Sequence, residues 1–105
     1  MARIAIITGA GSGIGKAVAL ALAGDGFDVV LAGRRAAALD GVAADIAAKG
    51  GRAIAVPTDV ADAGAVERLF VRAQEAYGRV DLLFNNAGMS APPVPFDEQI
   101  GRAHV

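Results

Sequence analysis

The sequence predicts an α/β fold in which helices cover both faces of a parallel β-sheet. Four short apolar runs alternate with helical patterns, and a glycine-rich or polar turn separates each run from the next helix. Such alternation with short connections is typical of right-handed β-α-β units, which build a doubly wound parallel sheet. The expected strand order is 3-2-1-4, and ligands bind such sheets where the order reverses, at the carboxyl ends of the strands.

The first predicted strand is a continuous apolar run, typical of a parallel strand that is buried on both faces. The third run stops at Pro57, which has no N–H to donate to a neighbouring strand. The predicted strand ranges are 3–8, 28–33, 53–56 and 80–84.

Three helices are predicted between these strands, each from an apolar face at helical spacing. The first covers Lys16 to Ala23 and ends near Gly24 and Gly26, and the second ends at Gly50 and Gly51. Asp62 is expected to cap the third helix, and Gly78 to end it. The predicted core faces are Ile14, Val18 and Leu22 in the first helix, Leu39, Val42 and Ile46 in the second, and Val66, Leu69, Phe70 and Ala73 in the third.

The turn after the first strand, Thr8-Gly9-Ala10-Gly11-Ser12-Gly13-Ile14-Gly15, is the strongest functional motif. A strand, a glycine turn and a helix together present free N–H groups and a positive helix end to a phosphate. A Walker A loop would need glycine at Ala10 and a hydroxyl at Ala17, and G-x-G-x-x-G would need glycine at Ile14 or Lys16. Thr-Gly-x-x-x-Gly-x-Gly fits at every fixed position. A glycine loop without a ligand is the alternative interpretation.

The overall composition excludes several classes of protein. A net charge of −1 gives no electrostatic reason to expect binding to nucleic acid or to an acidic membrane. The absence of cysteine excludes disulfides and thiolate metal sites, and the single histidine, His104, suggests no metal site. Neither a signal peptide nor a membrane span is predicted. We therefore expect a cytoplasmic protein that contacts neither nucleic acid nor membrane.

Three motifs, in order and each after its predicted strand, carry a family resemblance. They are the Thr8–Gly15 turn, Asp59-Val60, and Asn85-Asn86-Ala87-Gly88. With these motifs the chain resembles the N-terminal half of a short-chain dehydrogenase/reductase over residues 3–99, and Ser12 points to the ordinary short branch of that superfamily. The resemblance implies a Rossmann-like sheet, truncated after its fourth strand, and an NAD(P)-dependent oxidoreductase that interconverts an alcohol and a carbonyl by hydride transfer.

The resemblance also implies which residues bind the cofactor. Asp59 would accept a hydrogen bond from the adenine amino group, although a turn or capping role after Pro57 stays open for this residue. The implied ligands are Gly9, Ser12, Gly13, Ile14 and Gly15 for the diphosphate and adenosine ribose, Asp59 and Val60 for adenine, and Asn86, Ala87 and Gly88 for the ribose side and the fourth strand.

The corner after the second strand bears on the choice between NADP and NAD. An NAD enzyme usually places a carboxylate there, whereas an arginine accommodates the 2′-phosphate of NADP. This chain has Arg34 and Arg35 and no acid at that corner. A guanidinium pairs with phosphate through charge-assisted, bidentate hydrogen bonds, which favours NADP. A solvated charged loop is the alternative, and it keeps NAD possible.

No catalytic residue is assigned. Tyr77 is followed four residues later by Asp81, so the family's Tyr-x-x-x-Lys pair is absent at this point, and Tyr77 is expected to pack at a helix end. The family's catalytic residues would all lie beyond Gly88, so the chain alone is expected to be inactive, and its parent to be a homo-oligomer with a small-molecule substrate. A dinucleotide-binding sensor without turnover and a non-functional gene fragment are the alternatives.

The last six residues, 100–105, depart from the family's usual continuation. Ile100-Gly101-Arg102-Ala103-His104-Val105 resembles the translation of a sequencing-library adapter. We therefore expect residues 1–99 to be the N-terminal part of the dinucleotide-binding domain and residues 100–105 to be a non-native tail. A natural short tail is the alternative.

Overall fold

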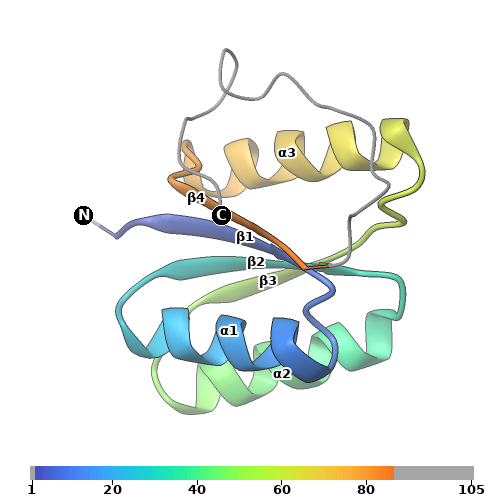
Figure 1. The fold of residues 1–105 in the computed structure, drawn as a ribbon. Helices are drawn as coiled ribbons and strands as arrows, with labels where there is room; N and C mark the ends of the chain where they lie inside the picture. Colours follow the sequence, from blue (N-terminus) through green and yellow to red (C-terminus); the bar gives the residue numbers. More distant parts are fainter. Residues whose placement is uncertain (1, 87–105) are drawn as a thin grey trace.

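A single parallel sheet with the strand order β3-β2-β1-β4 organises the chain (Figure 1). The computed structural model describes residues 2–86. The fold class and the strand order are those predicted from the sequence. The elements are β1 (Ile4–Thr8), α1 (Gly13–Gly24), β2 (Asp28–Gly33), α2 (Ala36–Ala48), β3 (Ala53–Pro57), α3 (Ala63–Tyr77) and β4 (Leu82–Asn85).

The helices lie on both faces of the sheet, with α1 and α2 on one face and α3 on the other (Figure 1). Successive strand side chains point to opposite faces, so each central strand contributes to two cores. In β1, for example, Ile7 packs in the core under α1 and α2, whereas Ile6 packs in the core under α3. Both side chains are fully buried, which explains why these strands are apolar without alternation.

The strands are in register at their carboxyl ends, which places the turns that follow them along one edge. Thr8 of β1 is paired with Asn85 of β4, and Gly33 of β2 is paired with Pro57 of β3. The loops after β1, β2 and β3 therefore begin at one level, beside the point where the chain order reverses between β1 and β4.

The predicted end signals of α3 are confirmed. Asp62 is its N-cap, and Asp62 Oδ1 accepts hydrogen bonds from the N–H groups of Gly64 at 2.9 Å and Ala65 at 3.3 Å. Gly78 ends the helix with a φ of 81°, in the left-handed region that favours glycine. Helices α1 and α2 differ, because neither N-cap residue, Ser12 or Arg35, makes a side-chain cap hydrogen bond.

Two elements begin two or more residues away from the predicted position, while the other strand boundaries agree with the prediction to within one residue. Strand β4 begins at Leu82 rather than Val80. The reason is that the carboxylate of Asp81, and not a backbone carbonyl of β4, accepts the hydrogen bond from the N–H of Ile4. Helix α1 begins at Gly13, ahead of the Lys16 predicted from the apolar pattern, because its first turn is made by the glycine motif itself.

Candidate functional site

A cavity of about 440 Å³ opens at the carboxyl ends of β1, β2 and β3. Three loops form its walls: the glycine turn after β1, the corner between β2 and α2 with the first turns of α2, and the loop between β3 and α3. The lining residues are Gly9, Gly11, Ser12, Gly33, Arg34, Arg35, Ala38, Leu39, Thr58, Asp59, Val60 and Ala61.

Backbone hydrogen bonds tie the three walls together. The N–H of Ala10 donates to the carbonyl of Ala32 at 3.0 Å, which joins the glycine turn to the end of β2. The N–H of Thr58 donates to the carbonyl of Gly33 at 2.7 Å, which joins the β3–α3 loop to the same strand end. The cavity is therefore held in shape by the sheet that carries it.

The glycines of the turn are required by its geometry. Gly9 and Gly13 have φ values of 61° and 59°, in the region that side-chain-bearing residues rarely adopt. A Cβ on Gly15 would lie only 2.0 Å from the carbonyl oxygen of Gly9. Since Ser12 makes no side-chain cap, the first-turn N–H groups of α1 keep their capacity to donate to an anion. This backbone suits a diphosphate.

Asn85, the last residue of β4, and the following Asn86 lie beside this turn. The amide nitrogen of Asn86 is 3.1 Å from the position that a Gly15 Cβ would occupy, and Thr8 Oγ1 donates to Asn85 Oδ1 at 3.0 Å. Two motifs that are far apart in the sequence thus meet at the switch point. Asn86 does not line the cavity itself, and the predicted residues Ala87 and Gly88 lie outside the described residues.

Arg34 and Arg35 form a positively charged corner of the cavity, which we call the arginine corner. Both side chains are exposed, and within residues 2–86 neither makes an ion pair. Arg35 is also the N-cap of α2, so the positive end of that helix faces the same corner. Asp59 stands on the β3–α3 wall, and the lining carries two cations against this one carboxylate.

One carboxylate oxygen of Asp59 accepts a hydrogen bond within its own loop, and the other accepts none from the described residues. Its Oδ1 accepts the N–H of Ala61 at 3.0 Å, and its backbone carbonyl accepts the N–H of Asp62 at 3.0 Å. Asp59 Oδ2 makes no hydrogen bond to another described residue. Asp59 therefore has the turn role that the sequence analysis gave as its alternative. Its Oδ2 stays available as an acceptor at an exposed position of the cavity wall.

The structure brings six predicted site residues together in the cavity lining: Gly9, Ser12, Arg34, Arg35, Asp59 and Val60. Gly13, Ile14 and Gly15 begin α1 directly after the lined part of the turn. The sequence prediction missed six further lining residues. Gly11 belongs to the predicted glycine turn, and the others are marked only by lying within four positions of a predicted residue: Gly11, Gly33, Ala38, Leu39, Thr58 and Ala61.

Tyr77 does not line this cavity and packs at the end of α3, as predicted. The guanidinium of Arg52 sits 5.8 Å from its ring centroid. Burial raises the pKa of Tyr77 above its ordinary value of 10.0, the Asp28 carboxylate adds to this effect, and Arg52 opposes it. Its hydroxyl therefore stays protonated at neutral pH.

A metal-binding cluster and a membrane-spanning helix are both absent from residues 2–86. This part of the chain holds no cluster of three or more histidine, aspartate or glutamate side chains that could bind a metal ion. None of its helices combines the length and the apolar character that crossing a membrane requires.

The strand order and the cavity at the carboxyl ends of the strands together define an α/β protein of the Rossmann-like class. A family model described as short chain dehydrogenase matches residues 3–101. The chain is 47% identical over 90 residues to a 3-oxoacyl-[acyl-carrier-protein] reductase of Synechocystis, a match that covers 85% of this chain and 36% of that protein. The chain therefore belongs to the short-chain dehydrogenase family.

Solved structures agree with this assignment. A short-chain dehydrogenase/reductase from Burkholderia phymatum in complex with NAD superposes with a TM-score of 0.77 at 42% identity, over 79% of this chain and 30% of that one. A 3-ketoacyl-ACP reductase from Sinorhizobium meliloti gives a TM-score of 0.80 at 41% identity, over 91% of this chain and 38% of that one. The chain thus spans about a third of the length of these relatives.

Proposed function

We propose that this chain is the cofactor-binding half of an NAD(P)-dependent oxidoreductase that interconverts an alcohol and a carbonyl by hydride transfer. One observation carries the proposal. A single cavity joins the glycine turn, the arginine corner and the uncommitted oxygen of Asp59, which together match the parts of an adenine dinucleotide.

The residues of the lining fit these parts in order. The N–H groups at the start of α1, with Gly9, Ser12, Gly13, Ile14 and Gly15, would hold the diphosphate and the adenosine ribose. Asp59 Oδ2 would accept the adenine amino group, with the backbone of Val60 beside it. Asn86, together with Ala87 and Gly88, would border the ribose side. The bound nicotinamide would supply the hydride chemistry, while these residues bind and orient the dinucleotide.

We propose NADP rather than NAD as the cofactor. Arg34 and Arg35 line the cavity without an ion pair among the described residues, so both guanidinium groups can pair with a 2′-phosphate. The carboxylate that would accept the 2′-hydroxyl of NAD is absent from this corner. NAD remains the second choice, and one solved relative is named as an NAD complex.

The proposal gives this chain no catalytic residue. Asp59 is the only carboxylate in the described cavity lining, and it belongs to the adenine wall. The residues that move protons, and those that bind a small-molecule substrate, would be supplied by the rest of a full-length protein, which we expect to be cytoplasmic and homo-oligomeric. The chain by itself would bind cofactor without turnover.

A non-catalytic dinucleotide sensor is the second candidate, because the described cavity contains binding groups and no acid–base pair. Binding and turnover separate the two functions. A full-length protein that contains residues 1–99 should bind NADPH more tightly than NADH and oxidise it with a carbonyl substrate. Binding without turnover across a carbonyl panel would favour the sensor, and affinity for neither cofactor would refute both.

A further inference from the structure

The glycine turn and the first turn of α2 touch at one close contact, between Gly11 and Ala38. A Cβ built on Gly11 would lie 3.0 Å from the Cβ of Ala38, and the next nearest atoms are 3.9 Å away. Both residues line the cavity. A separation of 3.0 Å is tighter than nearly all real Cβ contacts, so a side chain at position 11 would push Ala38 away by a few tenths of an ångström.

The turn has little freedom to yield at this contact. On one side the N–H of Ala10 is hydrogen-bonded to the carbonyl of Ala32 at 3.0 Å. On the other side Gly15 packs so closely against the carbonyl group of Gly9 that a Cβ on Gly15 would lie 2.0 Å from the carbonyl oxygen. Extra volume at position 11 would therefore displace Ala38 and the start of α2.

The arginine corner would move with Ala38. Arg35 is the N-cap of α2, and its carbonyl accepts the N–H of Leu39, the neighbour of Ala38, at 3.2 Å. Arg34 precedes it directly. The Gly11–Ala38 contact thus links the backbone that would hold the diphosphate to the backbone that carries the two guanidinium groups.

We propose that Gly11 and Ala38 are positioning residues, whose contact sets the distance between the diphosphate turn and the arginine corner and so determines the preference for a 2′-phosphorylated dinucleotide. The inference rests on the proposed function, because it assigns the arginine corner to the 2′-phosphate. Neither residue needs to touch that phosphate. A misplaced guanidinium loses the charge-assisted geometry of its phosphate pair, whereas the N–H groups of α1 are unaffected.

The test compares NADPH and NADH affinities, measured by titration of the cofactor fluorescence, in a full-length protein that contains residues 1–99. Gly11→Ala should weaken NADPH binding by about fivefold and NADH binding by less than about twofold. Adding Ala38→Gly to this variant moves the methyl group of the contact from position 38 to position 11. The double variant should therefore recover the original ratio of NADPH affinity to NADH affinity. Gly41→Ala is the matched control, since it adds the same methyl group to α2 where nothing lies within 4 Å.

Ala38→Gly alone is a second variant that adds no atoms, and it should lower the same ratio by a smaller factor. An unchanged ratio in Gly11→Ala and Ala38→Gly would overturn the inference, as would equal losses for both cofactors or a failure of the double variant to recover. If the unaltered protein prefers NADPH in these cases, the proposed function survives. An unaltered protein that binds neither cofactor would refute the proposed function itself.

Discussion

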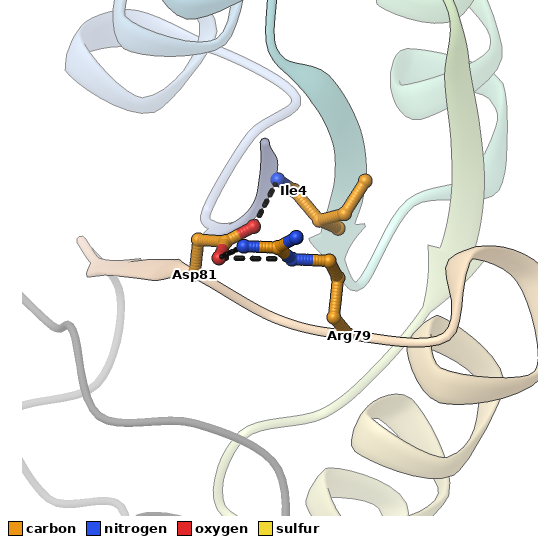
Figure 2. A network of polar contacts seen from close by, with 3 residues as sticks. All are labelled: Ile4, Arg79 and Asp81. Atoms are coloured by element: carbon orange, nitrogen blue, oxygen red, sulfur yellow. Dashed lines mark hydrogen bonds and ion pairs between the residues drawn. The ribbon is translucent and has the colours of Figure 1, made fainter. Parts of the chain in front are cut away.

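Ile4 and Asp81 are joined by two hydrogen bonds that run in opposite directions. The N–H of Asp81 donates to the carbonyl of Ile4 at 2.8 Å, and the N–H of Ile4 donates to Asp81 Oδ2 at 2.8 Å. Figure 2 shows the carboxylate between Ile4 and Arg79, whose Nε donates to Asp81 Oδ1 at 3.0 Å. One side chain thus fastens the start of β4 to the start of β1.

Replacing this carboxylate should destabilise the fold without touching the cavity. Asp81→Ala would leave the N–H of Ile4 without its acceptor, and we expect a loss of about 1–3 kcal/mol in the free energy of unfolding. Asp81→Asn retains an oxygen that can accept this N–H and should cost less. Urea denaturation measures both variants, and equal stability of Asp81→Ala and the parent would contradict the assigned role.

The ionisation of Asp81 should make the free energy of unfolding depend on pH. Burial acts to raise the pKa of Asp81, but hydrogen bonds from Arg79 and Ile4 and the charges of Arg79 and Arg3 outweigh it and hold the pKa below the ordinary value of 3.8. A group whose pKa is lower in the folded state stabilises the protein above its unfolded pKa. This contribution should be complete above about pH 5 and lost as the pH falls through the folded pKa.

The pH prediction is measured as the difference in unfolding free energy between the parent and Asp81→Asn, from neutral pH down to the acid limit of the folded state. The difference should shrink as the pH falls below 3.8, the ordinary value. A difference that stays constant over this range would show that the charge of Asp81 is not involved.

The glycine turn should not tolerate a side chain at Gly15. A Cβ there would overlap the carbonyl oxygen of Gly9, at 2.0 Å, so Gly15→Ala must distort the turn or the start of α1. We expect the free energy of unfolding to fall by about 1–3 kcal/mol or more, and dinucleotide binding to be lost. Gly24→Ala is the control on the same helix, because nothing lies within 4 Å of its added Cβ. Cofactor titration and thermal unfolding check both.

The arginine corner should decide between the two cofactors. Arg34→Asp combined with Arg35→Ala removes both guanidinium groups and adds a carboxylate for the 2′-hydroxyl, so NADPH affinity should fall by about 10–100-fold while NADH affinity rises. Arg72→Ala, on the exposed side of α3, removes one arginine away from the cavity and should change neither affinity. An unaltered preference in the double variant would remove the assignment of these arginines.

The two oxygens of Asp59 can be tested separately. Asp59→Asn keeps an oxygen for the N–H of Ala61 but replaces the uncommitted acceptor by an amide donor. The stability of this variant should be preserved, and its NADPH affinity should fall about tenfold. The variant should bind the hypoxanthine analogue of NADPH, whose 6-oxo group accepts hydrogen bonds, better than NADPH itself. Asp59→Ala should weaken both stability and binding. Equal affinity of the Asn variant for both bases would contradict an adenine contact.

The fold could be predicted from the sequence because its signals are local. The apolar runs, the capping carboxylate of Asp62 and the stop at Gly78 act through neighbouring residues, and the structure places the corresponding strands and helices in the predicted order. The spacing of glycines in the Thr8–Gly15 turn likewise depends on backbone conformation within a few residues. For the cavity, local motifs predicted six of the lining residues but not the six others that complete its walls.

Only the tertiary structure decided how these local pieces meet. Asp81 is hydrogen-bonded to Ile4 across 77 positions of sequence, and the Gly11–Ala38 contact joins the turn after β1 to the first turn of α2. No sequence pattern encodes such distances, because they result from strand register and from the packing of helices on the sheet. The sequence by itself determined the order of the elements and the turn that suits a phosphate, whereas packing determined which residues share the cavity and how far apart they stand.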